Sequence, residues 1–170
     1  KNLQIPDNIS FEYVSEQSNK RNEYHNKIQS NLKEGLQLYH IFDYQWESKP
    51  DIIKSIINSK VGTYVTKISA RKCDIIKLEK YQKSSFLNVN HLQGNDNSTF
   101  DIGLVYKEEI VAVMTFCKSR FNKNYEWEIS RYSSKKYTQV IGGFSKLLKY
   151  FRKENSGSII SYADRAISIG

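Results

Sequence analysis

The chain has 170 residues, 39% hydrophobic and 26% charged, a composition that fits one folded domain or one domain with a small addition. No apolar run approaches the roughly 20 residues of a membrane-spanning helix, so we expect no membrane partner. Two cysteines, Cys73 and Cys117, are too few for a disulfide framework and lack CxxC spacing. Buried, reduced thiols in a cytoplasmic protein are the simplest interpretation.

The net charge of +8 is distributed unevenly along the chain. Residues 1–60 carry eight Lys/Arg and eight Asp/Glu, whereas residues 61–170 carry eighteen and ten, so the whole excess (18 − 10 = 8) lies in the second part. A basic region of this kind favours a polyanionic partner, and we predict DNA. The alternative is a solubility surface, because Lys and Asn are abundant throughout, as translation of AT-rich DNA would give.

The first 58 residues predict the order β-α-β-α. Residues 9–14 have the composition of a strand, and residues 16–34 are polar with a narrow apolar stripe, which indicates a surface helix. Residues 36–42 form an apolar run typical of a buried strand. Residues 49–58 predict a short helix with a proline in its first turn.

The second part predicts the order β-α-β-β-β-α-β, after a linker at residues 61–67 that separates the neutral segment from the basic one. The predicted strands are residues 68–78, 100–106, 110–117, 127–132 and 158–163, and the predicted helices are residues 79–90 and 140–153. Residues 107–109 close a hairpin, and residues 118–124 form a basic loop.

Paired glycines, Gly142 and Gly143, mark the start of the last predicted helix. Glycine is a poor helix former, so two together indicate open backbone N–H groups or the close approach of a strand or ligand. In a parallel βαβ unit the crevice lies beyond the carboxyl ends of the strands, beside the helix N-terminus. We therefore expect Arg131 and Asp164 to approach these glycines, with a plain Arg131–Asp164 ion pair as the alternative.

The element order of the second part, with glycines at the start of its last helix, resembles the GNAT acyltransferase fold. In that family the helix start carries Q/R-x-x-G-x-G/A, whose backbone N–H groups hold the pyrophosphate of acyl-CoA. Gln139 and Gly142 match this motif, and Phe144 stands at its third position. The resemblance implies that Gln139, Gly142 and Gly143 bind acyl-CoA or a related donor.

The segments WEISRYSS, GGFSKLLKYFRK and IISYADR resemble the C-terminal domain of phage-encoded endonuclease-like proteins. They are also similar to the Mom family of phage DNA-modifying proteins, which have a GNAT-like fold and act on adenine in DNA. The similarity covers residues 71–165 and implies catalytic roles for Arg131 and Asp164, with His91 as a third candidate. Such domains continue past the position of Gly170, so we expect a C-terminal truncation.

The segment LQLYHIFDYQWESKPDIIKSII resembles the end of the Vsr-like nuclease domain of phage homing-type endonucleases. The resemblance places Glu12 at a catalytic, metal-binding acid and His25 in the family's YH pair, which implies Mg²⁺-dependent cleavage. The family's first Asp would fall near Asn2, so we predict a degenerate domain with weak metal binding. Glu12 and His25 also fit an ordinary strand acid and a surface histidine, and we expect His40 to be a hydrogen-bonded core residue.

Basic and aromatic residues are mixed in the predicted loop, where Lys118, Arg120 and Lys123 surround an aromatic side chain, and Lys135 and Lys136 follow the next strand. We predict that these five cations contact DNA.

These observations predict a mixed α/β protein in which residues 1–60 are a remnant of a Vsr-like nuclease domain and residues 68–170 are a GNAT-like basic domain. The first hypothesis is a phage-type homing endonuclease, or its degenerate derivative, that grips DNA with the second part. The second is a Mom-like or GNAT-like transferase that modifies a nucleobase or another amine, and the third is a non-catalytic DNA-binding protein. All three imply the cytoplasm of a phage-infected or prophage-bearing bacterial cell.

Overall fold

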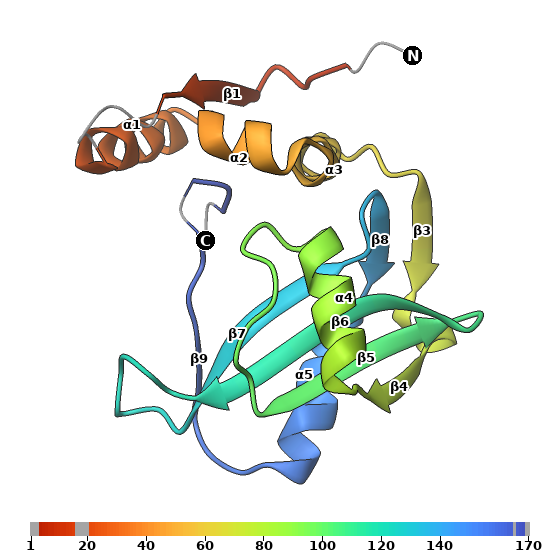
Figure 1. Ribbon diagram of the computed structural model, residues 1–170. Helices are drawn as coiled ribbons and strands as arrows, with labels where there is room; N and C mark the ends of the chain where they lie inside the picture. The colour runs from red at the N-terminus through yellow and green to blue at the C-terminus, as the bar shows by residue number, and fades with distance from the viewer. Residues whose placement is uncertain (1–3, 16–20, 165, 169–170) are drawn as a thin grey trace. The chain divides into compact units, whose positions relative to one another are not determined.

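The computed structural model describes residues 4–15, 21–164 and 166–168, without the side chains of residues 21, 22, 24 and 25 (Figure 1). The chain forms two compact units. The first draws on residues 1–63 and 163–170, and the second is Tyr64–Tyr162. Helices occur beside both parallel and antiparallel strands, so the predicted mixed α/β class is confirmed.

The first unit has a β-α-β order followed by two helices. Its elements are β1 (Ile9–Val14), α1 (Arg21–Lys33), β2 (Gln37–Phe42), α2 (Asp43–Ser48) and α3 (Pro50–Lys60). Strands β1 and β2 pair in parallel, with Glu12 opposite His40. The predicted β-α-β-α order is confirmed, and α2 is an addition because six residues are too few to show helical periodicity.

The second unit contains the larger set of elements. They are β3 (Thr66–Ser69), the 3₁₀ turn η1 (Ala70–Lys72), β4 (Asp74–Lys77), α4 (Lys80–Asn90), β5 (Phe100–Tyr106), β6 (Glu109–Lys118), β7 (Trp127–Ser134), β8 (Thr138–Ile141), α5 (Gly143–Glu154) and β9 (Ile159–Ser161). Five of the strands form one sheet in the order β4-β5-β6-β7-β9, in which only β7 and β9 run parallel. Strands β3 and β8 form a separate parallel pair.

Strand β6 lies at the centre of this sheet and contributes side chains to a hydrophobic core on each face. Successive side chains of a strand point to opposite faces. Phe116 therefore stacks on Phe151 of α5, with ring centroids 3.6 Å apart, while Val113 packs with Phe86 and Leu87 of α4. Figure 1 shows α4 and α5 on opposite faces of the five-stranded sheet.

The predicted hairpin at residues 107–109 is present as a tight turn. Lys107 and Glu108 both adopt positive φ, at 50° and 65°, which is the backbone of a two-residue turn between antiparallel strands. Neither residue is glycine or asparagine, the residues that favour this backbone. The pairing of β5 with β6 therefore fixes the turn, and the intrinsic preference of the turn residues does not.

The predicted strand at residues 68–78 is wrong, because the chain changes sheet within it. Strand β3 pairs with β8, η1 turns the chain, and β4 pairs with β5. The ammonium of Lys146 donates to the carbonyls of Ala70 and Cys73, at 2.9 and 2.5 Å, and stabilises the turn. No turn-forming glycine or proline marks this corner in the sequence.

The predicted helix start at Val140 is also wrong, since Val140 belongs to β8 and α5 begins at Gly143. Gly142 has φ +77°, a left-handed conformation that cannot be part of a right-handed helix. None of the helices formed by the described residues is both long and apolar enough to span a membrane.

Candidate functional site

The predicted catalytic acid lies in a small charged cluster of the first unit. Glu12 on β1 faces His40 on β2, with 3.0 Å between Oε2 and Nε2, and its Oε1 accepts a hydrogen bond of 2.6 Å from Lys27 of α1. The hydrogen bond from Lys27 holds the pKa of Glu12 below its usual value, so the carboxylate is ionised at neutral pH. Burial lowers the pKa of His40.

His40 is 1% exposed and hydrogen-bonded, as predicted for a core histidine. Its backbone N–H also donates to the Ala166 carbonyl at 2.9 Å, which ties the C-terminal segment to the first unit. The described residues contain no group of three His, Cys, Asp or Glu that could hold a metal ion. With Lys27 and His40 on its two oxygens, Glu12 does not form a suitable Mg²⁺ site here.

Two other predicted catalytic residues fall in the first unit. His25 lies in α1, and its side chain is outside the described part of the structure. Asp164 follows β9, and its Oδ1 accepts the Ala166 N–H at 3.0 Å. Arg131 belongs to the second unit, so the joint Arg131–Asp164 site remains a prediction.

The predicted cofactor residues surround the start of α5. Gly142 is the N-cap without a side-chain hydrogen bond, and a Cβ on Gly143 would come within 2.9 Å of the Tyr132 hydroxyl. The close approach of a strand, one of the two expectations for these glycines, is therefore observed. The Phe144 N–H donates to the same hydroxyl, and the two rings meet edge to face at 5.1 Å. The first turn of α5 is thus partly covered by β7.

The remaining predicted residues lie on β8, on β7 and at the end of α4. Gln139 sits on β8 opposite Lys67. Arg131 on β7 donates from Nη1 to the Ser130 carbonyl at 2.7 Å, and its buried Nε has no hydrogen-bond partner in the described chain. His91 caps the end of α4 rather than opening a strand, and its Nδ1 accepts the Gln93 N–H.

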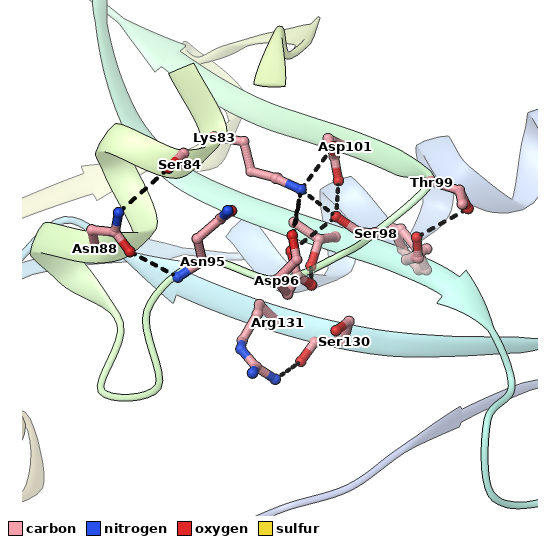
Figure 2. A network of polar contacts seen from close by, with 12 residues as sticks. Lys83, Ser84, Asn88, Asn95, Asp96, Ser98, Thr99, Asp101, Ser130 and Arg131 are labelled. Atoms are coloured by element: carbon pink, nitrogen blue, oxygen red, sulfur yellow. Dashed lines mark hydrogen bonds and ion pairs between the residues drawn. The ribbon is translucent and has the colours of Figure 1, made fainter. Parts of the chain in front are cut away.

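A buried ion cluster between α4 and the sheet was not predicted from the sequence. Lys83 of α4 points between Asp96 and Asp101, with 3.4 Å from Nζ to one oxygen of each carboxylate (Figure 2). The three side chains are only 5%, 3% and 10% exposed. The ammonium also donates to the Asp96 carbonyl at 2.9 Å and to the Ser98 hydroxyl at 2.8 Å.

Hydroxyl groups complete this cluster. Ser98 Oγ bridges the two carboxylates, and Thr115 Oγ1 on β6 donates to Asp96 Oδ2 at 2.7 Å. Burial alone would raise the pKa of Asp96, but hydrogen bonds from hydroxyl groups and the charge of Lys83 hold it below its usual value of 3.8. The polar groups are satisfied, so the cluster anchors residues 91–99 over the sheet rather than forming an open reaction centre.

The sequence does carry one signal for this cluster. Lys83 lies three and four positions before Phe86 and Leu87, on the inner face of α4, where a lysine is rarely tolerated without a partner. A lysine at such a position indicates a buried carboxylate from elsewhere in the chain.

Positive charge accumulates on the second unit. Residues 64–162 hold 17 Lys/Arg and nine Asp/Glu, so this unit carries 17 − 9 = +8, the whole net charge of the chain. Several of its carboxylates lie in ion pairs within the unit, including Glu154 with Lys77 and Glu128 with Arg120.

Exposed cations follow one side of α5. Lys149 and Lys153 lie one turn apart, and Arg152 is next to them. Exposed Arg71 and Lys72 lie in η1, the turn that Lys146 of this helix holds. We call Lys149, Arg152 and Lys153 the α5 basic face.

Three of the five predicted DNA-contacting cations lie at the end of β6 or in the loop that follows it, and the other two follow β7. Lys118 lies over the Trp127 ring, 3.9 Å from its centroid, and Lys123 Nζ donates to the Ser119 carbonyl. Arg120 pairs with Glu128 but keeps 48% of its side chain exposed. Lys135 pairs with Glu109, and the backbone N–H of Lys136 donates to Asn90.

Searches of protein-family models, of curated proteins and of solved structures find no match to this chain. The Vsr-like, GNAT-like and Mom-like resemblances therefore remain predictions from the sequence motifs.

The buried ion cluster predicts a large effect of Lys83→Met on stability. Removing the ammonium leaves two carboxylates buried without a counter-charge, so we expect the free energy of unfolding at pH 7 to fall by about 3–5 kcal/mol in urea titrations followed by circular dichroism. The control is Lys80→Met, which removes an exposed charge from the same helix. It should change the free energy of unfolding by less than about 0.5 kcal/mol.

The loss of stability in Lys83→Met should depend on pH and be largest near neutral pH. Asp96 has a lowered pKa in the folded protein, so its contribution to stability is present above its usual value of 3.8 and is lost as the pH falls through the lower, folded value. In Lys83→Met the carboxylates bind protons more readily. The difference in the free energy of unfolding between the variant and wild type should therefore become smaller as the pH falls from 7 toward 4. A pH-independent difference would contradict the electrostatic explanation.

Proposed function

We propose that the protein acts on DNA and that its second unit binds the DNA backbone, as a phage-type relative or degenerate derivative of homing-type endonucleases. The observation that supports this most is the confinement of the entire +8 net charge to residues 64–162. A field of this kind attracts a polyanion and releases its counterions on binding.

The arrangement of charges within the unit supports the same proposal. Each ion pair neutralises one cation and one acid and leaves the excess of positive charge unchanged. The α5 basic face presents exposed cations about one helical turn apart. Lysine and arginine on a helix face suit contacts with successive phosphates, which position a protein on DNA without reading its sequence.

A second candidate function is phosphodiester cleavage, and the cluster of Glu12, Lys27 and His40 favours it. An ammonium and an imidazole each lie within hydrogen-bond distance of one ionised carboxylate, in the unit that resembles a nuclease. The cluster contains groups able to transfer protons and to contact a phosphate. Its fit to Mg²⁺ is poor, which favours a degenerate derivative.

The transferase alternative depends on the start of α5. The parallel pairing of β7 with β9 ends at Ile129, and the glycine N-cap leaves that helix without a side-chain cap. Tyr132 and Phe144 cover part of this helix start, so we rank this alternative below DNA binding. Saturable binding of acyl-CoA that is lost in Gly142→Val would reverse the ranking.

Salt-dependent binding tests the main proposal. We expect non-specific duplex affinity in the micromolar range that weakens steeply between about 50 and 200 mM salt, measured by fluorescence anisotropy. Changing Lys149 and Lys153 to Gln should weaken binding and reduce the slope of log affinity against log salt by about two, because each lysine neutralises one phosphate.

The matched control changes Lys33 and Lys54 to Gln, which removes the same charge from exposed positions of the first unit. This variant should keep most of the wild-type affinity and slope. An affinity that does not change with salt, or equal losses in both variants, would count against binding by the second unit.

Plasmid nicking tests the second candidate. If the cluster cleaves DNA, supercoiled plasmid should be nicked in Mg²⁺ or Mn²⁺, and Glu12→Gln should abolish the activity because it removes the ionised carboxylate. Glu34→Gln, an exposed acid beyond α1, serves as the control and should retain it. Nicking that persists in Glu12→Gln would exclude this cluster, and an intact plasmid with wild type would leave DNA binding as the function.

A further inference from the structure

The loop between β6 and β7 presents an aromatic side chain to solvent. Phe121 is 77% exposed. Its ring lies edge to face with that of Tyr162, at 6.0 Å between centroids, and Tyr162 is 51% exposed. Two rings from segments 41 positions apart thus form one exposed pair. One ring belongs to the loop that projects beyond β6 and β7, and the other directly follows β9 (Figure 1).

The loop that carries Phe121 is held by its own hydrogen bonds. Ser119 N–H donates to the Glu126 carbonyl at 3.1 Å, and Ser119 Oγ donates to the Asn122 carbonyl at 2.6 Å. Lys123 Nζ donates back to the Ser119 carbonyl at 3.1 Å. The ring is therefore presented by an ordered turn, and a ligand that stacks on it needs little further ordering of the loop.

One cation lies beside the Phe121 ring, and two more lie in the same loop or at its base. The Arg120 guanidinium carbon lies 5.7 Å from the Phe121 centroid, and the buried Glu128 carboxylate holds that guanidinium in place. Lys123 lies in the same loop, and Lys118 is at its base over Trp127. The acidic Glu126 lies in the same loop and is engaged by Ser158, whose N–H and Oγ both donate to it.

The loop base adjoins the last turn of α5. Trp127 packs edge to face on Phe151 at 5.1 Å. A shallow hollow of about 300 Å³ is lined by Lys118, Glu126, Trp127 and residues 154–157. The ring pair therefore lies on the same unit as the α5 basic face, with the hollow between the loop base and the helix end.

We propose that Phe121 and Tyr162 form a stacking platform for unpaired bases of single-stranded DNA, a proposal that rests on the proposed DNA-binding function and specifies its ligand. Bases offer flat π-faces that stack on exposed aromatic rings regardless of sequence, and neighbouring cations hold the phosphates. The mixture of exposed rings and Lys or Arg favours this ligand over an apolar protein partner, which would not use the cations.

The test compares single-stranded and duplex DNA with the full chain. Wild type and Phe121→Ala are titrated with labelled oligo(dT) and with a duplex of similar length, at one fixed salt concentration. Stacking contributes about 1–3 kcal/mol per base, so Phe121→Ala should weaken oligo(dT) binding by about 5–150-fold and change duplex binding less than about twofold. Phe121→Trp, which keeps a stacking surface, should restore oligo(dT) binding, and Tyr162→Ala should weaken it.

The outcomes separate this proposal from the function on which it rests. Duplex binding with no effect of Phe121→Ala on oligo(dT) would overturn the platform and leave DNA binding intact. Equal losses for both ligands would also overturn it, since a base-stacking contact does not act on paired bases. Absence of binding to either ligand by wild type would overturn both proposals, and Phe121-dependent binding to anionic vesicles alone would assign the platform to a membrane surface instead.

Discussion

The second unit depends on the burial of one positive charge between two negative ones. Lys83 reaches from α4 to Asp96 and Asp101, and all three side chains are at least nine-tenths buried. Burying such charges is costly unless each is paired and hydrogen-bonded, and here Ser98 and Thr115 supply the remaining contacts. The cluster fixes the connection between α4 and β5 on one face of the sheet, while Phe116 and Phe151 fill the opposite face.

The acidic groups that hold the second unit together are buried, whereas many of its basic groups are exposed. The carboxylates of the cluster are buried against Lys83, and Glu128 is buried against Arg120, so positive and negative charge are neutralised together. The excess of +8 stays on the unit, and the exposed lysines and arginines of α5 and η1 carry part of it. The same unit that is held together by buried ion pairs therefore presents a positive surface, which is the physical basis of the proposed DNA binding.

Much of the fold could be predicted because most elements follow simple patterns. The strands from Phe100 to Lys118 are apolar runs separated by a short polar turn, and α4 and α5 have apolar positions at helical spacing. The corner at Ala70–Lys72 could not be predicted, because Lys146, more than 70 positions away, stabilises it. Strand β8 was missed because its four residues pair only with distant β3.

The candidate site was predicted less completely than the fold. Glu12 was predicted as a catalytic acid, but its ion pair with Lys27 was not. Lys27 is one of many polar residues in the sequence of α1, and nothing there distinguishes it from the others. Lys83 was not singled out from the sequence, because its carboxylates come from the loop before β5 and from β5 itself, and sequence patterns do not show that they meet α4. The basic character of the second part was correctly read from counts alone, since charge sums do not depend on geometry.

The central claim is that the second unit contacts DNA. Backbone amide chemical shifts of the ¹⁵N-labelled full chain, followed by NMR during titration with oligo(dT) and then with a duplex, test it most directly. We predict shift changes at Arg120–Lys123 and Tyr162 with oligo(dT), and along the last two turns of α5 with the duplex. Shift changes confined to the first unit, around Glu12, Lys27 and His40, would contradict this account.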